Sequence, residues 1–298
     1  MQKHLLLFLL PSVFPLCLMG QTMTVETVKG EKIQYRLTDI ESVTFSEETP
    51  EEPQQAPRIG DFLYADGSWS TQLQSDLKPI GIVFHVGEAS AYSDRLSYYY
   101  YKDGSTPMTE IHGYAVALHD ATVVDGVNQT VWWSAWKNND EGAGCSTNIE
   151  DFLGYTNTRS IVSKAASLGG LSDADDNFPA AYYATVAYEQ KCPAPENTSG
   201  WFLPSAYQFK YIFDRAYFDD DHSGRACLEN SFKTLGAAQA TPLLTDDAEY
   251  WTSTESVDSY GYSNWAYYFN FDARSVGPGF IANYRKNAGM RVRSMIVF

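Results

Sequence analysis

Histidine and cysteine are scarce in this chain, which has five histidines and four cysteines among 298 residues. Beyond residue 20 the histidines are His85, His112, His119 and His222, and none lies in a metalloprotease or serine-hydrolase motif. The chain also contains no C-x-x-C pair of the zinc-binding type. Because these reactive side chains are few and stand outside catalytic motifs, we expect a protein that is not an enzyme.

Lysine and arginine are also few: 21 of them stand against 37 aspartate and glutamate residues, which gives a formal net charge of −16. Such a charge repels nucleic-acid phosphates and anionic membrane surfaces. We therefore expect no nucleic-acid partner, and neutral glycans, cationic ligands, divalent ions and other proteins are the ligand classes that remain.

Long hydrophobic runs are missing after the first twenty residues. Residues 1–20 carry Lys3 and then an apolar run that Pro11 and Pro15 interrupt. This pattern predicts a signal peptide, cleaved after Gly20, because the run is too short and too broken to span a bilayer. We expect no transmembrane segment, and a mature protein that is secreted or held at the outer-membrane surface.

Two small segments follow the predicted signal peptide. Residues 21–45 alternate in polarity around a turn at Lys29-Gly30, which predicts a short β-hairpin module. Its last residues, DIESVTF, resemble the end of a β-module that follows the signal peptide in many exported proteins of gut anaerobes. Residues 46–57 contain four glutamates and three prolines with no large apolar residue, which predicts an acidic, extended linker.

From residue 58 onwards the pattern is that of a compact α+β domain, with strands predicted at 78–87 and 111–121. A turn at Asp66-Gly67 predicts a hairpin. Antiparallel strands are predicted in the tail. Three helices are predicted here, and a fourth, after Ser205, is described next. The first is capped by Asn157 or Thr158 and closed by Gly169, the second starts at Pro179, and the third lies around Phe232 and is closed by Gly236.

The stretch from Trp201 to Phe213 predicts a well-capped helix. Ser205 stands at the N-cap position with Gln208 three residues later, which is a capping box. The apolar residues that follow recur at helical spacing and predict one buried stripe, made of Phe209, Ile212, Phe213 and Ala216.

Several of these motifs, taken in order, resemble a known family. The segments NTRSIV, PAAYYATVAY, GWFLPSAYQFKYI, YWTSTES and NWAYYFNF, with a closing RVR, are similar to the C-terminal domain of bacterial collagen-like adhesins. That family has a C-type lectin-like fold, in the branch related to formylglycine-generating enzymes. The resemblance implies such a domain over residues 58–298, with a loop-rich antiparallel sheet braced by two or three helices. The enzymes of that branch use paired cysteines in the tail, whereas the last cysteine here is Cys227.

Calcium is a candidate ligand but no cofactor is required. Asp219, Asp221 and Ser223, followed by Gly224, match the opening of a calcium-binding loop. The twelfth position is Asn230 and so lacks the glutamate that such loops use. A solvated acidic turn is the simpler interpretation.

Three cysteines remain after the predicted signal peptide: Cys145, Cys192 and Cys227. Export permits a disulfide, and an odd number leaves one thiol over. Cys192 and Cys227 flank the capped helix and are the best candidates for a pair, although spacing alone leaves their pairing open.

The binding surface is predicted in the C-terminal loops. Residues 256–265 and 277–289 are dense in Tyr, Asn, Ser and Gly, residue types that build adaptable binding surfaces. In proteins of the C-type lectin-like fold, loops of this terminal region form the ligand face. The predicted contact residues are Tyr260, Tyr262, Asn264, Asn283, Tyr284 and Asn287, while Trp201, Trp251, Trp265 and Arg293 are expected to hold the scaffold.

Three hypotheses of function follow. The first is a non-enzymatic, cell-surface protein that recognises glycan through these loops. The second is an adhesive tip or accessory subunit of a surface filament that binds protein. The third, an enzyme of the formylglycine-generating type, has the missing tail cysteines against it.

Overall fold

The computed structural model of this protein describes residues 22–26, 32–41, 55–124, 126–135, 142–173, 177–214, 224–243, 248–271 and 280–298. The chain divides into two compact units, residues 1–53 and 54–298. In its described residues the first unit forms a β-hairpin, and the second holds the larger sheets and the α-helices.

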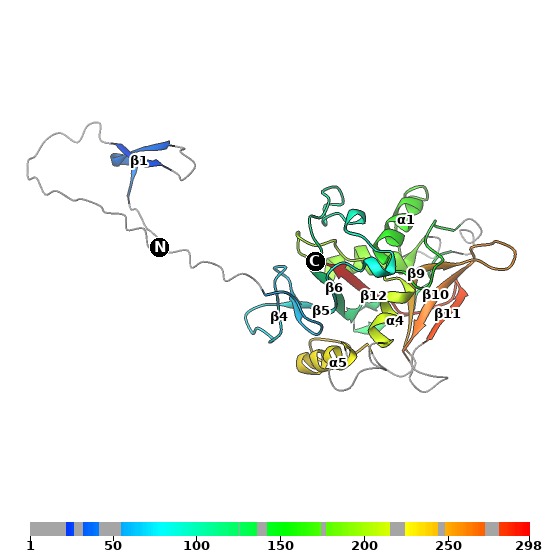
Figure 1. Ribbon diagram of the computed structural model, residues 1–298. Helices are drawn as coiled ribbons and strands as arrows, with labels where there is room; N and C mark the ends of the chain where they lie inside the picture. The colour runs from blue at the N-terminus through cyan, green and yellow to red at the C-terminus, as the bar shows by residue number, and fades with distance from the viewer. Residues whose placement is uncertain are drawn as a thin grey trace, which may run out of the picture. The chain divides into compact units, whose positions relative to one another are not determined.

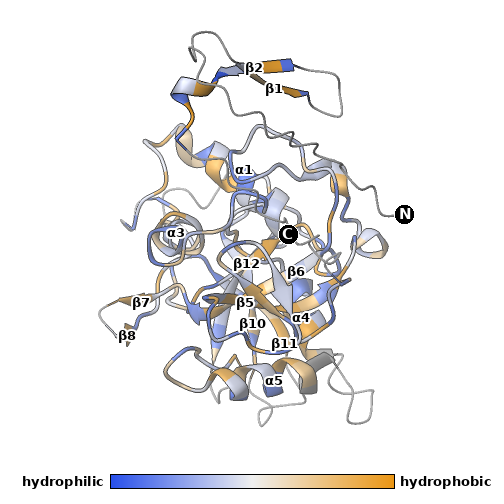
Figure 2. Cartoon of the chain, turned by 90° about the vertical axis from the view of Figure 1, so that its left-hand side faces the viewer, coloured by the Kyte–Doolittle hydropathy of each residue, from blue (hydrophilic) through white to orange (hydrophobic). Residues whose placement is uncertain are grey.

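The hairpin pairs β1 (Thr22–Glu26) with β2 (Lys32–Arg36) in antiparallel register, and a 3-10 turn, η1 (Leu37–Asp39), follows it. Val25 lies opposite Ile33. Both side chains are exposed, and Figure 2 shows hydrophobic and hydrophilic residues alternating along the two strands. Because two strands alone bury little apolar surface, the hairpin has no core of its own.

A five-stranded antiparallel sheet forms the centre of the second unit, in the order β12-β6-β5-β3-β4. The strands β5 and β6 pair through its middle, and the C-terminal strand β12 lies beside β6 (Figure 1). The strands predicted at 78–87, at 111–121 and on either side of Asp66-Gly67 are confirmed. Their bounds are β3 (Phe62–Tyr64), β4 (Trp69–Ser70), β5 (Pro79–Val86), β6 (Gly113–Asp120) and β12 (Arg293–Val297).

Both faces of this sheet are buried, so its central strands carry apolar residues at consecutive positions. Val116 of β6 belongs to the apolar cluster that contains α4 (Ala206–Asp214) and α5 (Gly224–Leu235). The next-door Ala115 belongs to the opposite cluster, which contains α1 (Gly154–Ala166). The sheet is therefore the middle layer between two groups of helices.

A three-stranded antiparallel sheet, ordered β11-β10-β9, carries much of the C-terminal part of the chain (Figure 1). Its strands are β9 (Glu249–Ser256), β10 (Trp265–Asn270) and β11 (Phe280–Arg285). Helix α4 packs on this sheet, and the ring of Phe209 lies 6.1 Å from that of Phe269. The loop between β9 and β10 contains two of the predicted contact tyrosines.

The helix predicted from Pro179 is present, but a π turn interrupts it. The segment runs without a break as α2 (Pro179–Tyr182), the π turn η5 (Tyr183–Ala187) and α3 (Tyr188–Lys191). The remaining short elements are η2 (Ser90–Tyr92), η3 (Leu96–Tyr98), β7 (Val123–Val124) and β8 (Val127–Asn128).

The capping box predicted at Ser205 is confirmed. The Ser205 backbone N–H donates to Gln208 Oε1 at 2.8 Å, and the Gln208 backbone N–H donates to Ser205 Oγ at 3.4 Å. These two bonds fix the start of α4. The predicted stripe is buried at Phe209, Ile212 and Phe213, while Ala216 lies outside the described residues.

Helix α1 begins earlier than the sequence predicts. It starts at Gly154, so Asn157 and Thr158 lie inside the helix and the prediction that either caps it is wrong. Both side chains are buried and serve other contacts. Thr158 Oγ1 donates to Gly154 O at 2.8 Å, and Asn157 Oδ1 accepts from the backbone N–H of Ser146 at 2.8 Å.

Cys145, Cys192 and Cys227 are all free thiols, so the suggested pairing of Cys192 with Cys227 is wrong. Cys227 lies on α5 and packs against Gly60, whereas Cys192 follows α3 and lines a hollow of the other helix group. Burial raises the pKa of Cys192 to about 11, which keeps its thiol protonated at neutral pH.

At the level of class, the second unit is α+β, with antiparallel sheets and a few helices, as the sequence predicts. In the described part of the chain, no helix is both long enough and apolar enough to cross a bilayer.

Candidate ligand-binding site

A hollow of about 530 Å³ opens where β9 ends and β10 and β11 pair. We call it the tyrosine hollow. Its lining comes from residues 256–260, from Asn264 and Trp265 at the start of β10, and from Asn283 and Arg285 on β11. Three segments that are separate in sequence therefore meet at one surface.

The loop between β9 and β10 is shaped by Asp258. Its Oδ1 accepts from the backbone N–H groups of Tyr260 and Tyr262, each at 2.9 Å. Gly261 between them has a φ of +85°, a conformation that glycine adopts without strain. This tight turn directs the Tyr260 side chain outwards, and its exposed fraction of 84% is the highest among the exposed large apolar and aromatic residues described.

The opposite wall is held by β11. Asn283 Nδ2 donates to Ser256 Oγ at 2.7 Å, which ties this strand to the end of β9. The ring of Tyr284 packs edge-on against Trp265 at 6.1 Å, yet half of its side chain stays exposed. A tyrosine held on one side and open on the other offers a pre-ordered ring face to a ligand.

Asn264 contributes an unused acceptor to the tyrosine hollow. Its Oδ1 is buried and has no hydrogen-bond partner in the described part of the chain. Buried polar atoms nearly always find a partner. A ligand hydroxyl or N–H that reaches this oxygen satisfies it.

A buried ion pair joins the residues that precede Ser256 and follow Arg285 of this lining. Lys286 pairs with Glu255, and both side chains are almost fully buried. The Lys286 ammonium also lies 4.3 Å from the centre of the Trp133 ring. Burial lowers the pKa of Lys286, and the charge of Glu255 opposes that change. The backbone N–H groups of Ala143 and Cys145 donate to Glu255, so the pair also anchors the segment next to the hollow.

Three of the six predicted contact residues line the tyrosine hollow: Tyr260, Asn264 and Asn283. Tyr262 and Tyr284 are exposed but are not part of its lining, and Tyr284 lies on the opposite face of β11 from Asn283. Asn287 is half-buried in the turn after β11 and is not part of the lining.

Arg285 and Trp265 also line the hollow, although the sequence pattern did not single out Arg285 and favoured a scaffold role for Trp265. The other three scaffold residues, Trp201, Trp251 and Arg293, are buried as expected. The alternation of β11 places Arg285 and Asn283 on one strand face, and that spacing of two was the available signal.

The calcium candidates Asp219, Asp221 and Ser223 lie outside the described residues. Among the residues that are described, no cluster of three or more histidine, cysteine or acidic side chains is arranged to hold a metal ion.

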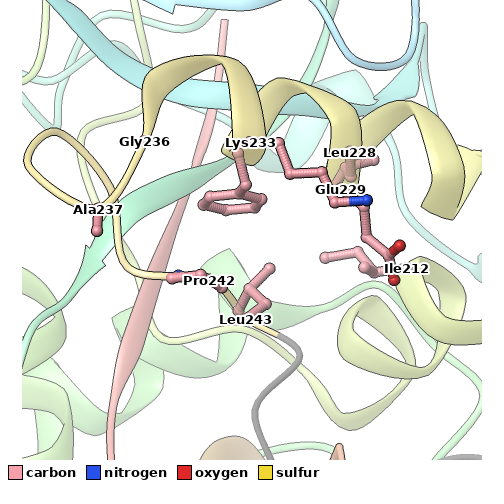
Figure 3. Close-up of a pocket in the computed structure, with 9 residues that line it drawn as sticks. Ile212, Leu228, Glu229, Lys233, Gly236, Ala237, Pro242 and Leu243 are labelled. Carbon is pink, nitrogen blue, oxygen red and sulfur yellow. The ribbon is translucent and has the colours of Figure 1, made fainter.

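A second hollow, of about 340 Å³, lies beside α5 and differs in character. Figure 3 shows Leu228, Pro242 and Leu243 around it, with Glu229 and Lys233 also on its α5 side. Its lining is mostly apolar and brings together few groups that form directional hydrogen bonds. The tyrosine hollow, with rings, amides, hydroxyls and an arginine, has the mixed chemistry of a recognition site.

Comparisons with known proteins yield a single kind of likeness, in the fold. No protein-family model matches the sequence, and no curated protein does. Among solved structures, the fold is similar to that of a fimbrial protein from Bacteroides ovatus, with a TM-score of 0.54 and 19% sequence identity. The match covers 81% of this chain and 49% of that protein, so this chain spans about half the length of the fimbrial protein.

Proposed function

We propose that this protein is an exported accessory or tip subunit of a surface filament, and that its exposed tyrosines contact an extracellular ligand. The fold shared with a fimbrial protein carries the filament part of the proposal. The exposed rings of Tyr260, Tyr262 and Tyr284 support the contact part, because large exposed aromatic groups mark interaction surfaces.

Glycan recognition is the second candidate function, and the chemistry of the tyrosine hollow favours it. Exposed rings stack on the apolar faces of sugars, and the amides of Asn264 and Asn283 suit hydroxyl groups. A C-type lectin-like architecture for residues 58–298 stays part of this proposal. The two functions are compatible, since a filament subunit presents its ligand site away from the cell.

We further propose that the protein acts without catalysis, because the sequence contains no cysteine after Cys227. Calcium stays a candidate ligand of the segment around Asp219, and chelation tests it directly. Loss of ligand binding on addition of EDTA, with recovery on addition of calcium, would support that site.

The filament proposal is tested in the cells that naturally produce this protein, with a tagged copy of the full chain. Filaments are sheared from the surface, purified by sedimentation and labelled with gold against the tag. We expect gold particles on the filaments, at their ends or along them. A tag found only in the free, unsedimented fraction overturns the filament proposal.

The contact role of the exposed tyrosines is tested by replacing Tyr260, Tyr262 and Tyr284 together with alanine. Removing three exposed rings should weaken binding to a glycan array, or to host-cell surfaces, by about tenfold or more, since aromatic anchors dominate such contacts. The matched control replaces three exposed apolar residues elsewhere, Val127, Val162 and Leu168. Equal binding by the two triple variants would rule out a contact role for these three tyrosines.

A further inference from the structure

An open hollow of about 690 Å³ lies on the exposed face of α1, and the function proposed above leaves it unused. We call it the arginine hollow. Thr156, Arg159, Ser160 and Ser163 reach it from successive turns of α1, because residues three and four apart share one helix face. Two tyrosine rings, Tyr98 and Tyr100, form part of the facing wall.

The Arg159 guanidinium is held in a fixed orientation. It lies 4.7 Å from the centre of the Tyr100 ring and 5.7 Å from that of Tyr155. One of its nitrogens, Nη1, donates to Tyr155 Oη at 3.1 Å and lies 3.4 Å from Gly104 O. All of these partners are neutral. A stacked guanidinium whose partners carry no charge keeps its full attraction for an anion and loses little entropy on binding one.

The charge around this arginine runs against that of the whole chain. Among the described residues, the lining contains Arg159 and Lys164 and no acidic side chain, in a protein of net charge −16. The acidic residue Asp103 lies in the turn beside Gly104, and hydrogen bonds from Ser105 and Thr106 of that turn lower its pKa and keep its carboxylate ionised. An anion that enters the hollow meets the guanidinium of Arg159, whose hydrogen-bond and ring partners among the described residues are neutral.

The arginine hollow adjoins the tyrosine hollow. Ala143 and Gly144 line the first, and a Cβ at Gly142 would come within 2.9 Å of Ser263 Oγ, next to Asn264 of the second. Because one residue spans at most about 3.6 Å of chain, Gly142 and Gly144 are no more than about 7 Å apart. The segment from Gly142 to Gly144 is therefore a short divider between the two hollows. The buried carboxylate of Glu255 accepts from the backbone N–H groups of Ala143 and Cys145 and so holds this divider in place.

We propose that the arginine hollow is a subsite for the carboxylate or sulfate group of an acidic oligosaccharide whose neutral units lie on Tyr260 in the tyrosine hollow. The proposal rests on the ligand face of the proposed function. The rings and hydroxyls on both sides of the divider suit sugar rings, and the stacked arginine suits one acidic group. A ligand a few sugar units long contacts both hollows.

The test measures binding of defined probes to the full chain by calorimetry. The probes are an oligogalacturonate, a heparin-derived oligosaccharide, a neutral malto-oligosaccharide and an oligoglutamate peptide. The variants are Arg159→Gln, Arg159→Lys and, as an exposed arginine elsewhere, Arg58→Gln.

We expect at least one acidic saccharide to bind, and Arg159→Gln to weaken it about tenfold, the loss of one charge-assisted contact. Arg159→Lys should restore only part of the affinity, because lysine lacks the planar fork. Arg58→Gln should leave the affinity for the acidic saccharides unchanged. Arg159→Gln should leave the affinity for the neutral malto-oligosaccharide unchanged. Binding of the carboxylated or the sulfated probe supports the subsite and identifies which group it takes.

Three results overturn the inference: no saccharide binds, Arg159→Gln leaves the affinity for acidic saccharides unchanged, or only the peptide binds in an Arg159-dependent way. The filament experiment stands apart from all three. Gold-labelled filaments without saccharide binding would sink the subsite and keep the filament role. Arg159-dependent saccharide binding with no gold label on the filaments would keep the subsite and overturn the filament role.

Discussion

Asp94 is a carboxylate enclosed by tyrosines. Its Oδ2 accepts from Tyr99 Oη at 2.6 Å and from Tyr114 Oη at 2.7 Å, and the side chain is almost fully buried. Burial raises its pKa from 3.8 to about 6, although the hydrogen bonds from both tyrosines act in the opposite direction. The folded protein therefore binds a proton at pH values where the unfolded chain has released it.

The pH dependence of stability follows from that raised pKa. The contribution of Asp94 is fully present below pH 3.8 and is lost as the pH rises through about 6. Compared with Asp94→Asn, the wild type should lose up to roughly 3 kcal/mol between pH 4 and pH 7. Urea unfolding of both proteins at several pH values measures the difference, and parallel profiles would contradict it.

The pair of Lys286 and Glu255 gives a second prediction at the residue scale. Lys286→Met leaves a buried, uncompensated glutamate and should cost about 3–5 kcal/mol of unfolding free energy. The double variant Glu255→Gln, Lys286→Met should cost less than Lys286→Met alone, because no net charge stays buried. Chemical denaturation measures both, and a single-variant cost below about 1 kcal/mol would speak against this assignment.

Among the helices, the first residue of α1 packs closely against the N-terminal capping box of α4. A Cβ on Gly154, the first residue of α1, would lie 2.2 Å from Gln208 Oε1 and 2.8 Å from the backbone nitrogen of Ser205. The capping box of one helix thus occupies the space that a side chain on the other would need. This contact explains why α1 begins at a glycine that carries no capping side chain.

Gly154→Ala should therefore destabilise the protein by roughly 1–3 kcal/mol, the usual cost of overpacking. Val162→Ala, on an exposed position of the same helix, should change stability by no more than about 0.5 kcal/mol. Thermal unfolding of the two variants distinguishes this steric effect from a general weakening of α1. Similar melting temperatures for both would refute it.

At the scale of the whole molecule, the two compact units give a prediction about truncation. Residues 54–298 contain both large apolar clusters, while the strands of the hairpin expose most of their side chains. A fragment of residues 54–298 should unfold cooperatively within about 2 °C of the full chain, because a change of 1 kcal/mol moves a domain of this size by roughly 2–4 °C. A fragment of residues 66–298, which lacks β3, should fail to fold.

The cooperative transition is followed by near-UV circular dichroism, which reports the packing of the many buried rings. A melting temperature of the 54–298 fragment lower by more than about 5 °C would mean that the hairpin contributes to the stability of the main body, contrary to expectation.

Elements whose signals are local could be predicted from the amino-acid order. Alternation and apolar runs predicted the central strands, the Ser205–Gln208 spacing predicted the start of α4, and Gly236 predicted the end of α5. It also predicted a tyrosine-rich loop beside β10. These features depend on hydrogen bonds and side-chain periods within a few residues, which the order of amino acids contains directly.

Which of those residues come into contact depends on the packing of distant segments. Glu255 pairs with Lys286 across 31 positions, Trp265 and Arg285 join the tyrosine hollow, and Cys192 and Cys227 stay apart. The physical reason is that burial and pairing depend on which faces of distant strands and helices pack together. No periodicity within one segment specifies that choice.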